Sequence, residues 1–152
     1  MNPLRLTPSR LSKPVSDRRL LNDNKWTSET VVLNEQGRPR VLFHGTDKDF
    51  SSFADRPTWF IASKDLVTDY GTRFIKPVKL DIRNPYLSTH RENARLGADR
   101  LIRKAISLGH DGIVIPADES FAQEMMYYEA LSDVFVAFRS SQIHQVESGN
   151  QR

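Results

Sequence analysis

The chain has 152 residues, 38% of them hydrophobic and 27% charged, which is typical of one globular domain that buries its own core. It contains no cysteine, which excludes disulfide bonds and cysteine-ligated metal sites. No apolar run approaches the ~20 residues that a membrane-spanning helix needs, so the sequence predicts no membrane span.

The net charge of +3 comes from the first 25 residues. Residues 1–25 hold six basic and two acidic side chains, which leaves 16 basic and 17 acidic side chains, a net charge of −1, for the rest. This segment is rich in Pro, Ser, Arg and Asn and lacks the continuous apolar stretch of a signal peptide. We expect residues 1–25 to be a mostly disordered basic leader and residues 26–152 to form the domain. A basic arm can also bind nucleic acid, and its affinity would then fall steeply with salt.

Short runs of β-branched and aromatic residues, separated by turn residues, predict several strands. The run at residues 40–44 ends at Gly45, and alternation along it places Leu42 and His44 on one face. The predicted strands cover residues 30–33, 40–44, 58–62, 75–82, 112–115 and 134–138.

A short helix is predicted after the strand at residues 58–62. Ser63 is a favourable N-cap residue, and Gly71 is a plausible end. On this helix Leu66, Val67 and Tyr70 share one face. Core packing is therefore an alternative to a functional role for Tyr70.

A longer helix is predicted from about residue 91 to residue 108, with Gly109 at the position of a C-terminal cap. Residues 116–130 fit either a polar loop or a frayed helix. Together these elements predict an α+β fold, a twisted, mostly antiparallel split sheet with flanking helices. The apolar stripe of the long helix consists of Leu101, Ile102, Ala105, Ile106 and Leu108.

The stretch from Trp26 through Val-Val-Leu-Asn-Glu-Gln-Gly-Arg-Pro-Arg-Val-Leu-Phe-His-Gly-Thr at residues 31–46 resembles a family of ADP-ribosyltransferase-like domains. These domains occur in phage polyvalent proteins and bacterial effectors, and they are similar to the His-Tyr class that includes diphtheria toxin and the poly(ADP-ribose) polymerases. The resemblance spans about residues 26–146. Its further motifs follow in the family's order: Trp59-Phe60, Tyr70-Gly71, Asn84-Pro85, Gly109-His110-Asp111-Gly112-Ile113-Val114 and Gln142-Ile143.

The resemblance implies a pocket for NAD⁺ as co-substrate, with no metal. His44 would bind a hydroxyl of the adenosine ribose, and Gly45 would offer its main chain to the nicotinamide amide. Thr46 would support the loop or contact the ribose, and Tyr70 would stack on the nicotinamide ring. Taken from the residues alone, a histidine that closes an apolar strand is more often a structural residue than a catalytic one, and Gly45 can be a simple turn.

Two further residues are implied to line the same cleft, Phe60 and Ser63. The third catalytic role of the class, often filled by glutamate at the start of the last core strand, falls on Val134, which cannot perform it. The nearest acids are Asp133 and Glu129.

Gln142 is the other candidate for this third role, because the resemblance implies that related domains use a Gln in it. A structural role for Gln142 is equally open. The identity of the third catalytic residue is thus divided between Gln142 and Asp133.

The function implied by the resemblance is mono-ADP-ribosyl transfer from NAD⁺ to a protein acceptor, with a nucleic acid acceptor as a second option. The loops at residues 47–57 and 116–130 would contact the acceptor. We expect a monomer that is cytoplasmic or is delivered into a target cell as an effector or toxin. The alternative is a non-catalytic domain of the same fold that binds NAD⁺ or a protein partner.

Overall fold

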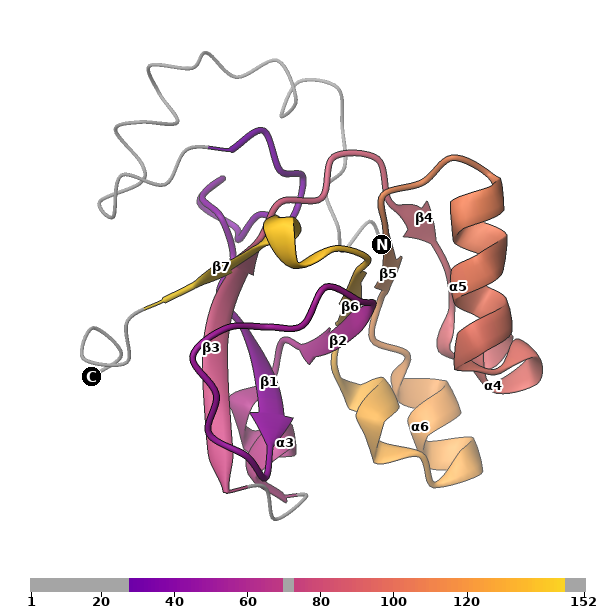
Figure 1. The fold of residues 1–152 in the computed structure, drawn as a ribbon. Helices are drawn as coiled ribbons and strands as arrows, with labels where there is room; N and C mark the ends of the chain where they lie inside the picture. The colour runs from indigo at the N-terminus through magenta and orange to yellow at the C-terminus, as the bar shows by residue number, and fades with distance from the viewer. Residues whose placement is uncertain (1–27, 70–72, 147–152) are drawn as a thin grey trace.

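The computed structural model of the protein describes residues 28–69 and 73–146 (Figure 1). The predicted leader at residues 1–25, Tyr70 and Gly71 lie outside the described residues. The strands are β1 (Leu42–Thr46), β2 (Thr58–Ile61), β3 (Phe74–Leu80), β4 (Tyr86–Leu87), β5 (Gly112–Ile115), β6 (Val134–Ala137) and β7 (Ile143–Gln145). The helices are α3 (Lys64–Asp69), α4 (His90–Leu96), α5 (Ala98–Ser107) and α6 (Glu119–Met125), with the 3₁₀ helices η1 (Tyr128–Leu131) and η2 (Ser140–Gln142).

The strands form one sheet in the order β4-β5-β6-β2-β1-β3-β7, in which only β4 and β5 are parallel neighbours. Strands β1 and β2 pair at a single position, Phe43 with Ile61. In contrast, β1 pairs with β3 along its whole length, and β2 does so with β6. The sheet therefore has two halves that meet at one residue pair. This confirms the predicted α+β fold with a mostly antiparallel, split sheet.

Alternation along the strands divides the core between the two faces of the sheet. On one face Leu42, Phe60 and Phe135 belong to one buried cluster. On the other face α5 packs Leu101 and Ala105 into a second cluster that includes strand residues of β5 and β6. Helix α5 lies beside β5, and α3 lies against β1 (Figure 1).

The single helix predicted over residues 91–108 is wrong, because Gly97 divides it into α4 and α5. Gly97 has a φ of 85°, a conformation that glycine adopts without the strain of a Cβ atom. Its amide donates to the carbonyl of Asn93 at 2.8 Å and closes α4. Of the predicted apolar stripe, Ile106 and Leu108 are 52% and 59% exposed.

The strand predicted at residues 30–33 is also absent as a sheet strand. Leu33 forms only an isolated bridge with Pro39. The segment is nevertheless part of the core, since Val31 and Val32 are buried and the Val31 amide donates to the carbonyl of Ile82 at 2.8 Å. Residues 116–130 are helical in part, as α6 and η1.

The Gly-His-Asp-Gly motif at residues 109–112 leads into β5 and makes close contacts with neighbouring main chain. Both carboxylate oxygens of Asp111 accept main-chain hydrogen bonds, from Arg83 and Asn84, at 2.8 Å each. A Cβ atom on Gly112 would lie 2.8 Å from the carbonyl oxygen of Val136, so only glycine fits there. These residues have structural contacts and lie outside the pocket described below.

Candidate active site

His44 lies in β1 with one ring nitrogen engaged by the fold. Its Nδ1 lies 2.9 Å from the carbonyl oxygen of Trp59 in the neighbouring strand. A carbonyl oxygen only accepts hydrogen bonds, so Nδ1 carries the proton and donates to it. In the neutral imidazole, Nε2 is then an acceptor, and it has no hydrogen-bond partner among residues 28–69 and 73–146.

Three aromatic rings surround the imidazole of His44. Their centroids lie 5.4 Å (Phe53), 5.6 Å (Phe60) and 6.4 Å (Phe50) from that of the imidazole. Phe60 is fully buried in the core and supports the imidazole from within the sheet, but it does not line the pocket. The packing holds the histidine ring in one orientation.

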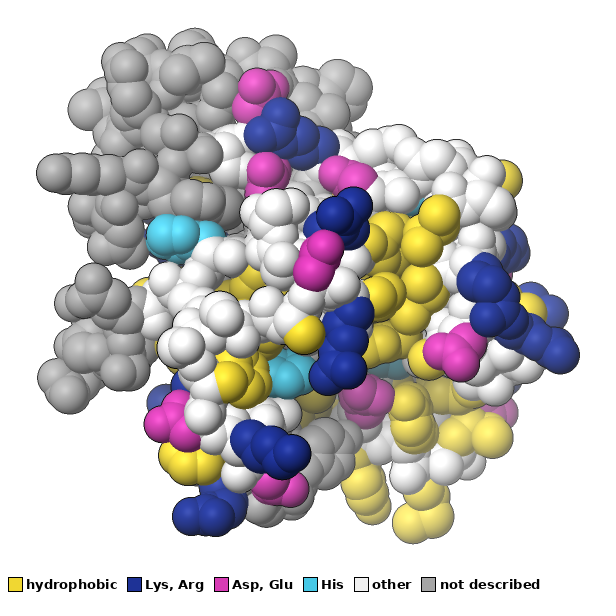
Figure 2. All heavy atoms as spheres, in the orientation of Figure 1, with side chains coloured by type: hydrophobic (Ala, Val, Ile, Leu, Met, Phe, Trp, Pro, Cys, Tyr) yellow, Lys and Arg dark blue, Asp and Glu magenta, His cyan; other side chains and the backbone are white. Residues whose placement is uncertain are grey.

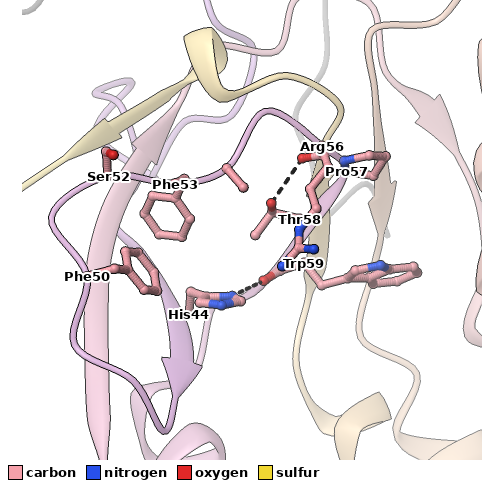
Figure 3. Close-up of a pocket in the computed structure, with 9 residues that line it drawn as sticks. His44, Phe50, Ser52, Phe53, Arg56, Pro57, Thr58 and Trp59 are labelled. Atoms are coloured by element: carbon pink, nitrogen blue, oxygen red, sulfur yellow. Dashed lines mark hydrogen bonds between the residues drawn. The ribbon is translucent and has the colours of Figure 1, made fainter.

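A pocket of about 470 Å³ opens beside His44 (Figure 3). The rings of Phe50 and Phe53 lie beside His44 on one side of the pocket, while the indole of Trp59 points away and packs against the other core cluster. The pocket falls in the size range of small-molecule sites. Its lining consists of His44, Phe50, Ser52, Phe53, Ala54, Arg56, Pro57, Thr58 and Trp59.

The loop that forms most of this lining, residues 47–57, is fastened to the sheet at several points. Lys76 of β3 donates to the carboxylate of Asp49 at 2.6 Å and to the carbonyl of Phe50 at 2.9 Å. Gln145 of β7 donates to the carbonyl of Ser51 at 2.8 Å. The pocket wall is thus held by contacts with β3 and β7.

Asp55 fastens the far end of the loop to η2. Its carboxylate accepts two hydrogen bonds from the Arg139 guanidinium, both at 3.1 Å, and one from the Ser140 amide at 2.9 Å. These hydrogen bonds, first that of Arg139 and then that of Ser140, lower the pKa of Asp55 from 3.8 to about 2. Asp55 is therefore ionised and engaged at neutral pH.

Gly45 and Thr46 follow His44 in β1, and both pair with β3, opposite Ile75 and Phe74. Toward β2 the pairing of β1 ends at Phe43, so the two strands separate beside these residues. The hydroxyl of Thr46 accepts a hydrogen bond from the amide of Lys48 at 3.2 Å. Neither residue lines the pocket, but both lie next to His44.

Ser63 is the N-terminal cap of α3, as the sequence predicted. Its hydroxyl accepts from the amide of Leu66 at 3.3 Å, and its own amide donates to the hydroxyl of Ser132 at 3.1 Å. Ser63 therefore orients α3, the helix that leads toward Tyr70. Tyr70 itself lies outside the described residues.

Asp133, a candidate for the third catalytic role, is engaged in structural contacts. One carboxylate oxygen pairs with the Arg40 guanidinium at 2.9 Å, and the other accepts from the amide of Ala117 at 2.7 Å. Its side chain is 13% exposed. The neighbouring Val134, which occupies the position of the class glutamate, is buried.

Gln142, the other candidate, forms hydrogen bonds to other segments of the chain with both the oxygen and the nitrogen of its side-chain amide. Its Oε1 accepts from the amides of Phe138 and Arg139, both at 2.9 Å. Its Nε2 donates to the carbonyls of Asp81 at 3.1 Å and Asp111 at 2.7 Å. These contacts favour the structural alternative for Gln142. The site does not bring His44, Asp133 and Gln142 together around one pocket.

Sequence reasoning overlooked His90 and most of the pocket lining. His90 is 1% exposed, with Nε2 lying 3.1 Å from the carbonyl oxygen of Ser132, and burial lowers its pKa below 6.5. Phe50, Phe53 and Arg56 lie in an irregular loop, where no periodicity marks a role. The only available signal was their closeness in sequence to His44.

Within the described part of the chain, no group of three histidine, cysteine or acidic residues is arranged to hold a metal ion. No helix there is long and apolar enough to cross a membrane.

Comparison with known families gives one match, which covers residues 34–152. The matching family is described as ADP-ribosyltransferase in polyvalent proteins. No curated protein and no solved structure matches the chain.

Proposed function

This chain belongs to the family of ADP-ribosyltransferases in polyvalent proteins, and we propose that it transfers a single ADP-ribose unit from NAD⁺ to a protein acceptor. The observation that carries the proposal is the state of His44. Because Nδ1 donates to the Trp59 carbonyl and Nε2 has no partner among the described residues, the neutral imidazole offers Nε2 as an acceptor beside the pocket. A ribose hydroxyl of NAD⁺ is a donor of the required kind.

The pocket suits one end of a dinucleotide. It has a volume of about 470 Å³ and an aromatic wall formed by Phe50 and Phe53, against which a purine ring can stack. The adenosine half of NAD⁺ would lie there. The nicotinamide half would then lie toward Gly45, where β1 separates from β2, and toward the predicted position of Tyr70.

The reaction breaks the bond between nicotinamide and C1′ of its ribose. Nicotinamide leaves as a neutral base with the electron pair of that bond, and a lone pair of the acceptor forms the new bond to C1′, while the acceptor releases its proton. In this chain His44 holds the adenosine ribose and so orients the bound NAD⁺, and the packed rings around His44 exclude water from that side. In the proposal, Tyr70 stacks on the nicotinamide and holds it in place as the bond breaks.

The third role stays a prediction for Asp133 or Gln142, and the contacts of both side chains argue against it, because each would first have to leave its present partners. Asp133 would have to separate from Arg40. Gln142 would have to break contacts to Asp81 and Asp111.

A protein acceptor is supported by an apolar surface at the end of α6 and in η1. Hydrophobic side chains gather over α6 in the space-filling view (Figure 2). Single exposed apolar side chains are common on protein surfaces, but contiguous clusters of them mark interaction sites. The exposed fractions are 57% (Met125), 73% (Met126), 36% (Tyr127), 59% (Tyr128) and 48% (Leu131).

We also propose that the protein is a monomer and that it acts in the cytoplasm or as a delivered phage or bacterial effector. Binding of nucleic acid through residues 1–25 stays a prediction, since that segment lies outside the described residues. It is tested by measuring whether deletion of residues 1–25 removes a salt-dependent affinity for nucleic acid.

A second candidate function is a non-catalytic domain that binds NAD⁺ or a protein. The observation that favours it is the start of β6, where Val134 is buried and Asp133 is paired with Arg40. No acidic side chain among the lining residues of the pocket is free to stabilise a cationic sugar.

The test incubates the full chain with NAD⁺ labelled in its adenosine half, with and without cell lysate, and measures nicotinamide release and protein labelling. We expect His44→Ala to lower both by roughly a hundredfold, because the ribose loses its fixed orientation. His110→Ala is the matched control, since His110 contacts Asn84 and Tyr86 and does not line the pocket.

Two outcomes would contradict the proposal, the first its activity and the second the role of His44. Binding of NAD⁺ without turnover supports the non-catalytic alternative. Equal turnover by the native protein and His44→Ala would remove His44 from the site.

A further inference from the structure

Arg56 is the one arginine or lysine among the residues that line the pocket, and no acidic residue lines it. Apart from His44, the other lining residues are aromatic, aliphatic or hydroxyl-bearing. Arg56 lies at the β2 end of the loop, across the pocket from Phe50 and Phe53 (Figure 3). A cation at the rim of a largely apolar pocket favours a ligand with an anionic group.

The main chain on both sides of Arg56 is held in place. The Arg56 amide donates to the carbonyl of Ala54 at 2.9 Å, and its carbonyl accepts from the hydroxyl of Thr58 at 3.1 Å. Pro57 fixes the next φ angle. The guanidinium, by contrast, forms no hydrogen bond or ion pair with any residue of the described ranges 28–69 and 73–146.

The acid next to Arg56 does not neutralise it. The carboxylate of Asp55 is directed to Arg139 and Ser140 of the C-terminal part of the chain. Because that carboxylate stays ionised and bound there, the positive charge of Arg56 is left available to a ligand. Of these two adjacent charged residues, Asp55 contacts the C-terminal part of the fold and Arg56 lines the pocket.

We propose that the guanidinium of Arg56 binds the pyrophosphate of NAD⁺, with the adenine directed across the pocket to Phe50 and Phe53; this rests on the proposed function. A guanidinium presents its N–H groups in a planar fork that matches two phosphate oxygens, and such charge-assisted bonds are stronger than neutral ones. Arg56 acts in binding the donor and takes no part in breaking the glycosidic bond.

The test compares three ligands by calorimetry: NAD⁺, ADP-ribose and adenosine, which lacks the phosphates. In Arg56→Gln we expect the Kd for NAD⁺ and ADP-ribose to rise roughly ten- to hundredfold. The Kd for adenosine should stay within about twofold, and the dependence of ADP-ribose binding on salt should become shallower, because one ion pair is lost. Arg56→Lys should recover part of the affinity, since it keeps the charge but loses the fork.

Arg103→Gln is the matched control. It removes the same charge from the exposed side of α5, which does not line the pocket, and should bind all three ligands as the native chain does.

Each contrary result points to a different failure. If Arg56→Gln binds ADP-ribose as tightly as the native chain, or loses adenosine to the same extent, the pyrophosphate assignment is wrong while the proposed function stands. If the native chain binds none of the three ligands, the proposed function fails and this inference fails with it.

Discussion

Around the pocket, the fold holds the main chain and leaves polar side-chain atoms available for a ligand. Before and after β6, by comparison, the polar side chains themselves make the contacts that stabilise the fold. His44 gives one ring nitrogen to Trp59, and the Arg56 guanidinium has no partner within the described ranges. Asp133 and Gln142, in contrast, place every side-chain oxygen and nitrogen in hydrogen bonds. Residue types alone do not distinguish a ligand-binding side chain from a structural one; the partners do.

The largest expected effect is that of Gln142→Ala. The variant removes four hydrogen bonds that join η2 to the ends of β3, β5 and β6, so we expect the free energy of unfolding to fall by about 3 kcal/mol. Chemical denaturation measures this change. NAD⁺ affinity at a temperature where the variant is folded should match that of the native chain.

Gln142→Glu sharpens the comparison, since it keeps the acceptor oxygen and replaces the donating nitrogen with a second acceptor. We expect a loss of stability comparable to that of Gln142→Ala, because the new oxygen would face the carbonyl oxygens of Asp81 and Asp111. A variant at this position that loses turnover while keeping its stability would instead make Gln142 a catalytic residue and break the contrast between the two regions.

A smaller effect is expected from Asp133→Asn. It removes the ion pair with Arg40 but keeps an oxygen for the Ala117 amide, so unfolding free energy should fall by about 1 kcal/mol. A double-mutant cycle with Arg40→Gln isolates the pair. Nicotinamide release should be unchanged; a tenfold drop in release with an unchanged midpoint of unfolding would restore Asp133 as the third catalytic residue.

The smallest expected effect concerns pH and the loop that carries Arg56. The folded pKa of Asp55 is about 2, against an ordinary 3.8, so its contribution is present above pH 3.8. It is lost as the pH falls toward 2, because the unfolded chain takes up the proton first. Hydrogen-exchange protection of residues 47–57 should therefore fall across this window in the native chain.

Asp55→Asn is expected to show low hydrogen-exchange protection of the same residues both above pH 3.8 and near pH 2. If its loop is protected like the native one at pH 5, the ion pair with Arg139 does not hold the pocket wall, and the contacts of Lys76 and Gln145 alone do so.

The sequence predicted the strands β1, β2, β3, β5 and β6, the Ser63 cap and the α+β class because these depend on local patterns. The short edge strands β4 and β7 were not predicted, and the strand expected at residues 30–33 is absent from the sheet. Gly109, predicted as a helix cap, has a φ of 86° and confirms that prediction. The break at Gly97 was not predicted, although a glycine inside a predicted helix is itself a local signal for a break. The structure shows that Gly97 adopts a φ of 85°, which a helix interior does not allow.

The roles of Asp133 and Gln142 lay beyond sequence reasoning for another reason. Their partners lie as far away as Arg40, 93 residues from Asp133, and Asp81, 61 residues from Gln142. A resemblance assigns a role by position, but the hydrogen bonds that engage a side chain come from segments that only the fold brings together.

The single residue pair that joins the halves of the sheet has a consequence for the pocket. Phe43 and Ile61 are the only paired position between β1 and β2, so one rung of the ladder joins the half with β1, β3 and β7 to the half with β2, β6, β5 and β4. His44 belongs to one half and Thr58 to the other, and both line the pocket. The pocket therefore spans the junction of the two half-sheets, where the hydrogen bond from His44 to the Trp59 carbonyl supplies a side-chain link in addition to the ladder.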